Sequence, residues 1–533
     1  MSCLVPNQRS GRSLASLFLL SVFLSFVVPT LALAQQNRRS LERLPSVEKI
    51  VARYLKAIGG KKRVAPVKDS ISEWSALVNN QPGGRARIVT KAPASSRLEL
   101  LLNDGEIASG TNSSSAWAKE LGEQPRTLTG PESATAKLQA VLDSAQFIDY
   151  KKKNVAARVL SGRGNASEPS FAVEFSTRSG GRLVYHFSRI TGLLNEMVDE
   201  ARGVSTLLSE YRDVDGLLVP HHLQIKRRGA PELSLFLTTV RRNTNPADSI
   251  FDPPPASEAL DVAALLRAVS KNQDELELRF TEYSFLQKET NREINSKGEI
   301  KKEKSRVYEV FPIANRGPVM KLLSEDGVVL SGERAAKEEN RVRKEFEEAE
   351  REKEKDEARA EKRRLERQRK NEDEVEISHF LRACEFVSPR RERLRDREAV
   401  VFDFRPRPGF RPKNRQEDLI SKLVGVIWID PADQQVMRLE ARLAEGFKMA
   451  GGLLFSLRPG AAFAMEQTRM AEGVWLPRFA QLNLSMKVLL FGGGDINRTI
   501  EWSDYKHFSG DVHDYKLDAP SSHRLPKPGL DVR

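Results

Sequence analysis

The residues best suited to chemistry in this 533-residue chain are few and scattered. His221 and His222 are adjacent in an apolar stretch that is typical of a strand, so they would face opposite sides and could not chelate one metal ion together. Asp511, His513 and Asp514 could supply metal ligands near the C-terminus, but a polar tail explains them as well. These residues therefore do not predict a metal site.

Motifs for nucleophilic catalysis or phosphate binding are also missing. The sequence contains no G-x-S-x-G, H-E-x-x-H, C-x-x-C or Walker motif. The stretch FGGGD at residues 491–495 has no following Lys or Ser, so it indicates a hairpin turn. Cys384 has no motif around it, and we expect a buried, inert thiol. The sequence favours a binding protein that is not an enzyme and that uses no cofactor.

The N-terminus has the pattern of an export signal. Arg9 and Arg12 precede an apolar run that ends in Ala-Leu-Ala at residues 32–34. The run approaches the length of a membrane span, so an uncleaved anchor is the alternative. Pro29 and the small residues at the end of the run favour cleavage after Ala34. We therefore expect a periplasmic protein whose mature chain contains a single cysteine, which allows no intramolecular disulfide.

The chain is basic, with a formal net charge of +13. The two arginines of the signal account for +2, which leaves 13 − 2 = +11 after cleavage. An exported protein does not meet nucleic acid, so an anionic membrane surface is the expected partner of this charge. A dispersed basic surface that only keeps the protein soluble is the alternative. The basic clusters lie at residues 61–63, 151–153, 226–228, 390–397 and 404–415.

The first half of the chain predicts a helix followed by a meander of strands. Apolar residues recur with a helical period over residues 47–58, with Ser46 as a possible N-cap. Beyond this helix the period changes to two, as in antiparallel strands with one buried face. A second helix is expected within residues 130–150. The alternating apolar sets are Trp74, Ala76 and Val78 in one strand, and Leu98, Leu100 and Leu102 in the next.

After three consecutive prolines, at residues 253–255, the same order restarts. A helix is expected at residues 260–269, and strands resume with LRFTEYSFLQKET at residues 278–290. Both halves also contain R-x-x-x-G-x-x-x-P, at Arg212–Pro220 and Arg469–Pro477, within a predicted hairpin. The second copy carries an insertion, GFKMAGGLLFSLRPGA, at residues 446–461. The pattern indicates an internal duplication, with coincidence between two ordinary hairpins as the alternative.

These features predict an α+β protein of two tandem antiparallel half-barrel domains, each preceded by an amphipathic helix. The expected boundaries are a signal peptide at 1–34, a first domain at 35–252, a linker at 253–257, a second domain at 258–515 and a polar tail at 516–533.

A highly charged helix is expected as an insertion at residues 333–377 of the second domain. Residues 333–376 contain 15 Lys or Arg and 17 Asp or Glu, without Pro or Gly. Opposite charges four residues apart support a helix. Only Ala335, Val342, Phe346 and Ala349 form an apolar stripe, so the N-terminal end should pack. The rest could be a projecting arm that reaches a protein partner, or simply a solvated helix.

The order of helix, meander, WIDPADQQVMRLEARL (residues 428–443) and EGVWLP (residues 472–477) in an exported chain resembles the LolA/LolB-like superfamily of periplasmic lipoprotein carriers. This resemblance implies an unclosed antiparallel β-barrel whose concave apolar face is plugged by helices and binds acyl chains. It therefore implies an acyl lipid or a lipoprotein as the partner. No lipid-accepting cysteine follows the expected cleavage site, so a membrane-anchored form is not expected.

The apolar residues of the second domain are the expected ligand lining. The strand VGVIWID, at residues 424–430, is apolar on both faces, and the insertion resembles an apolar flap next to two glycines. An ordinary core segment is the alternative. An envelope scaffold or sensor that binds a protein through its charged helix, and no small ligand, is the competing function. The expected lining residues are Trp428, Phe447, Met449, Leu453, Leu454, Phe455 and Trp475.

Overall fold

The computed structural model describes residues 44–160, 169–255, 260–280, 282–295, 299–313, 318–357, 377–449, 455–471, 473–488 and 492–507. The expected signal peptide, the C-terminal tail with Asp511, His513 and Asp514, and Leu453 and Leu454 lie outside these residues. None of the helices in the described ranges has the length and apolarity needed to cross a bilayer.

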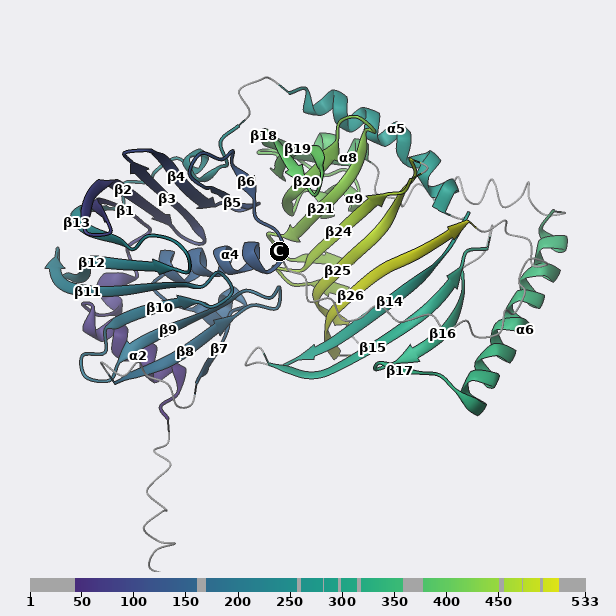
Figure 1. Cartoon of the computed structure of the whole chain (residues 1–533), viewed down its shortest axis with the longest axis horizontal. Helices are drawn as coiled ribbons and strands as arrows, with labels where there is room; N and C mark the ends of the chain where they lie inside the picture. Colours follow the sequence, from purple (N-terminus) through teal and green to yellow (C-terminus); the bar gives the residue numbers. More distant parts are fainter. Residues whose placement is uncertain are drawn as a thin grey trace, which may run out of the picture.

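The first half forms one antiparallel sheet of thirteen strands (Figure 1). Its strand order is β6-β5-β4-β3-β2-β1-β13-β12-β11-β10-β9-β8-β7, so the first strand pairs with the last and the sheet ends at β6 and β7. The strands are β1 (Asp69–Val78), β2 (Gln81–Lys91), β3 (Ser95–Leu102), β4 (Gly105–Thr111), β5 (Ala116–Lys119), β6 (Arg126–Thr127), β7 (Ala156–Val159), β8 (Ser170–Ser176), β9 (Arg182–Ser188), β10 (Leu194–Asp199), β11 (Val204–Val214), β12 (Leu217–Arg227) and β13 (Leu233–Arg242).

The second half forms another sheet of the same kind, with the order β17-β16-β15-β14-β26-β25-β24-β21-β20-β19-β18. Again its first strand pairs with its last, and the short strands β22 and β23 pair with each other beside β25. The strands are β14 (Tyr283–Ile294), β15 (Ile300–Phe311), β16 (Val319–Glu325), β17 (Val328–Val329), β18 (Cys384–Leu394), β19 (Arg397–Pro406), β20 (Leu423–Asp430), β21 (Gln435–Leu443), β22 (Phe447–Met449), β23 (Phe455–Leu457), β24 (Ala462–Arg469), β25 (Trp475–Val488) and β26 (Gly492–His507).

The two topologies correspond strand by strand after the helix that divides each half. Strands β7 to β13 match β18 to β26 once β22 and β23 are set aside. This excursion, between Phe447 and Leu457, falls in the insertion expected at residues 446–461. The repeated R-x-x-x-G-x-x-x-P stretches lie in equivalent hairpins, β11–β12 and β24–β25. The fold class expected from the sequence is confirmed, and the topology supports the duplication.

Helices α2 (Val47–Ala57) and α4 (Gly130–Ser144) cover part of one face of the first sheet. Ser46 caps α2 as expected, since its hydroxyl accepts from the amide of Lys49. Figure 1 shows α4 within the curve of the sheet, between β1–β4 and β7–β10. Three shorter helical segments complete this half: α3 (Lys61–Val64), η2 (Tyr150–Lys153) and η3 (Asp248–Phe251).

In the second half, α5 (Val262–Phe280), α8 (Ile377–Ala383) and α9 (Arg415–Ile420) pack on one face of the sheet. The helix α5 is longer than expected, because the expected strand at residues 278–290 begins only at Tyr283. The run from Lys271 to Arg279 contains several good helix formers, which explains why the helix continues.

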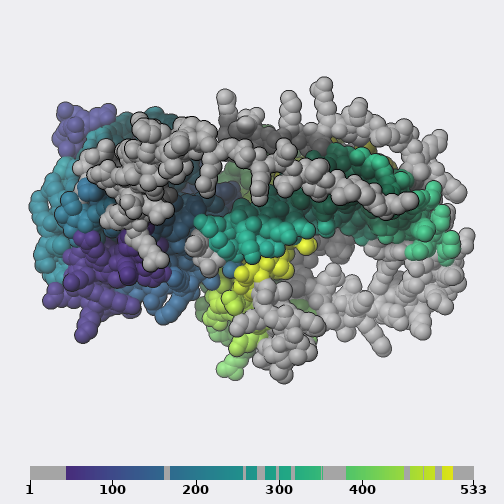
Figure 2. All heavy atoms as spheres, turned by 90° about the horizontal axis from the view of Figure 1, so that it is seen from below, coloured from purple at the N-terminus to yellow at the C-terminus, as the bar shows by residue number. Residues whose placement is uncertain are grey.

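The charged helix α6 (Gly332–Glu357) lies between β17 and β18, so it occupies the place in the chain that α4 has in the first half. Its apolar stripe packs as expected: Val342 and Phe346 are buried against Phe311 and Val319. Two side chains of α6 hydrogen-bond backbone groups of β16 on the side that faces the helix. Glu338 Oε1 accepts from the Leu322 amide at 2.7 Å, and Arg341 donates to the carbonyl oxygen of Met320. The helix therefore protects a sheet edge. Figures 1 and 2 place α2 and α6 at opposite ends of the molecule.

The two sheets meet through a buried polar network between β5–β6 and β18–β19, which lie side by side in Figure 1. The Arg390 guanidinium contacts Glu392 at 2.7 Å and Asp403 at 3.1 Å, and the three side chains are at most 5% exposed. From the first half, Thr127 donates to Glu392 at 2.6 Å and Ser115 donates to Asp403 at 2.6 Å. Both halves thus supply partners to one set of buried charges.

Candidate functional site

The seven residues expected to line a ligand site do not form one group. Trp428 and Trp475 lie in one buried cluster with Val401, Val426 and Met437, and they are 1% and 4% exposed. Phe447 is buried in a different cluster, with Leu443 and Ala461. Met449 and Phe455 pair on the β22–β23 hairpin. Trp428, Phe447 and Trp475 are not among the residues that line the cavity between the halves, and the ligand-binding role of the seven stays a prediction.

A different apolar surface of the first sheet is built from strand residues, and α4 packs beside it against β2, β3 and β4. It consists of thirteen side chains from six strands, and no described helix residue belongs to it. Five of these side chains are buried, and eight are only partly buried. We call this set the strand-only surface: Trp74, Ala76, Ala86, Ile88, Leu98, Leu100, Leu102, Ile107, Leu223, Ile225, Leu233, Leu235 and Leu237.

The strand-only surface is on the same face of the sheet as α2 and α4. Leu208, which packs against the helix-covered core, is directly opposite Leu223 of the strand-only surface in the β11–β12 ladder. Directly opposed residues of an antiparallel pair share a face. The helices therefore cover only part of the concave face, and the strand-only surface is its continuation beyond them.

The alternation in the sequence predicted part of this surface. Trp74 and Ala76 share it with Leu98, Leu100 and Leu102, as the period of two indicated. Val78 lies opposite Leu233 of this surface in the β1–β13 ladder but does not belong to the cluster. The sequence could not show that strands from both ends of the half, β1–β4 and β12–β13, combine their apolar faces.

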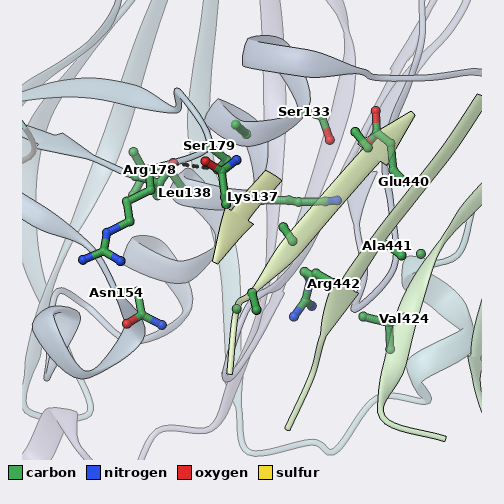
Figure 3. A pocket seen from close by; sticks show the side chains of 18 of the residues that line it. Ser133, Lys137, Leu138, Asn154, Arg178, Ser179, Val424, Glu440, Ala441 and Arg442 are labelled. Atoms are coloured by element: carbon green, nitrogen blue, oxygen red, sulfur yellow. Dashed lines mark hydrogen bonds between the residues drawn. The ribbon is translucent and has the colours of Figure 1, made fainter. Parts of the chain in front are cut away.

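A cavity of about 410 Å³ lies between the two halves (Figure 3). One wall comes from α4 and from turns of the first half at residues 93–94, 153–155 and 177–179. The other comes from the face of β20, β21, β24 and β25 that carries Arg438, Glu440 and Arg442. In Figure 3 the side chain of Lys137 extends from α4 toward these strands.

Sequence reasoning missed these cavity residues. The segment MRLEARL of β21 alternates strictly, with Arg438, Glu440 and Arg442 on one face and apolar residues on the other. That alternation reveals a polar face, which is usually solvated. Only the docking of the first half shows that another domain covers it.

The other candidates for chemistry have structural roles. The His222 ring stacks on Phe236, with ring centroids 4.6 Å apart, and His221 hydrogen-bonds the carbonyl oxygen of Val219. Cys384 is buried as expected, and burial raises the pKa of its thiol to about 12. A search of the described part of the chain finds no group of three or more His, Cys, Asp or Glu that could hold a metal ion.

No protein-family model matches the chain, and no curated protein matches it in sequence. Among solved structures, a LolA superfamily protein from Nitrosomonas europaea matches with a TM-score of 0.28 and 11% identity, over 39% of this chain and 98% of that chain. A lipoprotein-sorting protein domain from Vibrio parahaemolyticus matches with a TM-score of 0.27 and 10% identity, over 38% and 97%. The Pseudomonas aeruginosa MucA/MucB complex matches with a TM-score of 0.16 and 9% identity, over 85% and 94%. Proteins of the superfamily that the sequence resembles are thus among the solved structures similar to this chain.

Proposed function

We propose that the protein is an exported binding protein that holds an acyl chain, either of a free lipid or of a lipidated partner, on the strand-only surface of the first half. The observation that carries this proposal is a concave, partly exposed apolar surface of thirteen side chains beside two plugging helices. A contiguous apolar patch that stays partly exposed is typical of a ligand-binding or interaction site.

An acyl chain fits this surface for two reasons. The surface is a row of aliphatic side chains from adjacent strands, and each methylene buried against it stabilises the complex by about 0.8 kcal/mol. The set contains no charged side chain and only one aromatic residue, Trp74. Recognition would therefore depend on chain length rather than on a specific polar group.

The test is to purify the protein from its native envelope fraction and to identify lipids extracted from it by mass spectrometry. We expect about one acyl chain per protein. Binding of a fluorescent long-chain fatty acid then compares two neighbouring leucines on β3. Leu102 belongs to the strand-only surface, whereas Leu101 points to the other face and is 45% exposed.

Leu102→Asn should weaken fatty-acid binding severalfold, and Leu101→Asn should leave it unchanged. Equal effects of the two variants, or a protein without any acyl ligand, would overturn the proposal. A lipid-free protein that captures a protein partner through α6 would instead support the scaffold function.

A further inference from the structure

The cavity between the halves has an unbalanced set of charges. Five cationic side chains and one anionic side chain line it. Two of the cations already have carboxylate partners. Arg438 contacts Glu440 at 2.6 Å and Glu466 at 2.5 Å, and Arg178 contacts Asp495 at 2.7 Å.

The other three cations, which we call the cavity cations, are Lys137, Lys153 and Arg442. Among the described residues, their hydrogen-bond acceptors are backbone oxygens only. Lys137 Nζ donates at 3.0 Å, and Lys153 Nζ at 3.4 Å. No carboxylate of the described residues forms an ion pair with any of the three. The acceptors are the carbonyl oxygens of Ser114 for Lys137, Pro93 for Lys153 and Ser113 for Arg442.

Removal from water is the largest influence on all three cavity cations, and it lowers the pKa of Lys137, Lys153 and Arg442. The nearby charge of Glu440 raises the pKa of Lys137, and the charge of Arg442 lowers it. Cations that are partly removed from water and form no ion pair destabilise the docked halves. An anion in the cavity would remove this penalty.

We propose that the cavity is a binding site for a phosphate-type anion, held between Lys137 of the first half and Arg442 of the second. A guanidinium can donate two parallel hydrogen bonds to phosphate, and an ammonium supplies a compact point charge. The excess of positive charge suits a divalent anion better than a single carboxylate.

The cavity also has apolar walls, which allow the phosphate to carry an organic group. Leu138 and Val141 of α4 and Val424 of the second half are among its lining residues. The phosphate could therefore be a free anion or the headgroup of a lipid. Either would contact both halves at once and stabilise their docked arrangement.

Two probes distinguish these sources: inorganic phosphate and dihexanoyl phosphatidic acid below its micelle concentration. Isothermal titration calorimetry of each probe into the full chain should show saturable binding of one molecule per protein. Lys137→Gln and Arg442→Gln should each weaken that binding at least tenfold. Lys62→Gln is the matched control, because Lys62 is exposed on α3 and loses the same charge outside the cavity.

Binding of inorganic phosphate assigns the site to a free anion, and binding of phosphatidic acid alone assigns it to a headgroup. No binding of either probe, or an equal loss in Lys62→Gln, overturns the proposal. If a cavity variant does not fold, the proposal is tested by the thermal midpoint of the unmodified protein. That midpoint should rise with low millimolar concentrations of at least one of the two probes, at which the general salting effect of phosphate is small, but not with chloride at equal ionic strength; no rise with either probe, or an equal rise with chloride, refutes the site. The acyl proposal concerns a different surface and does not depend on this result.

Discussion

Replacing Arg390 by methionine should be among the most destabilising single changes in the protein. The guanidinium is 3% exposed and lies between the carboxylates of Glu392 and Asp403, which are 5% and 0% exposed. Methionine fills much of the same space but leaves two buried carboxylates without their cation. Breaking a buried ion pair by removing one partner costs about 3–5 kcal/mol. We expect a loss of that size in the free energy of unfolding.

The next residue in the chain supplies a matched control. Arg391 is 45% exposed and pairs with Glu398, which is 56% exposed. An exposed ion pair contributes about 0–1 kcal/mol, so Arg391→Met should have little effect. Asp403→Asn should have an intermediate effect of about 1–3 kcal/mol, because Arg390 keeps Glu392 as its partner.

The assay is urea unfolding followed by circular dichroism, with each variant compared at the same denaturant slope. Since the network joins the two halves, Arg390→Met should also increase proteolysis at their junction. The reasoning is refuted if Arg390→Met loses no more stability than Arg391→Met. It is also refuted if Asp403→Asn costs more than Arg390→Met.

Three further predictions concern separate parts of the chain. Burial raises the pKa of Asp143 to about 6, so the folded state binds more protons than the unfolded state as pH falls from 6 toward 4, and stability decreases as pH rises through that window. Asp143→Asn should flatten this dependence and raise the thermal midpoint at pH 7.5; an unchanged pH profile would contradict it. Replacing residues 353–370 by a short Gly/Ser linker should leave the thermal midpoint nearly unchanged, because the described buried side chains of α6, Val342, Phe346 and Ala349, all precede residue 353; a fall of more than about ten degrees would show packing along the whole segment. N-terminal sequencing of the exported protein should begin at Gln35, and an intact N-terminus would disprove cleavage after Ala34.

Much of the local structure follows directly from sequence patterns. The stripe of residues 47–58 forms α2, and Gly180-Gly181 lies in the turn between β8 and β9. The hairpin at Asp215-Gly216 also formed where expected, since both residues adopt the positive φ that a two-residue turn requires, 53° and 78°. These features depend on neighbours in the chain, so a local pattern is sufficient to predict them.

What could not be predicted depends on residues that are far apart in the chain. Arg442 alternates with apolar neighbours like any solvated strand residue, yet it lines the cavity between the halves and donates to the carbonyl oxygen of Ser113 in the first half. Glu339 is four residues before Arg343, a spacing typical of an ion pair along a helix, but it contacts Lys321 of β16 at 2.7 Å. Trp428 and Trp475 are 47 residues apart in the chain, and only the folded sheet brings them into one buried cluster; their expected role at a ligand stays a prediction. Tertiary contacts decided each of these cases.

The pairing of first and last strands has a consequence for biosynthesis. In each half, most strands pair with a neighbour in the sequence, and one long-range pairing joins the first strand to the last. That pairing aligns Ser70 with Arg242 in the first half and Thr290 with Thr499 in the second. Contacts so distant in sequence form late and slowly, because a long loop must close before they contribute. A half cannot complete its sheet until its final strand has emerged. A chain that crosses a membrane as an extended polypeptide thereby remains free of stable tertiary structure until each half has fully arrived on the other side.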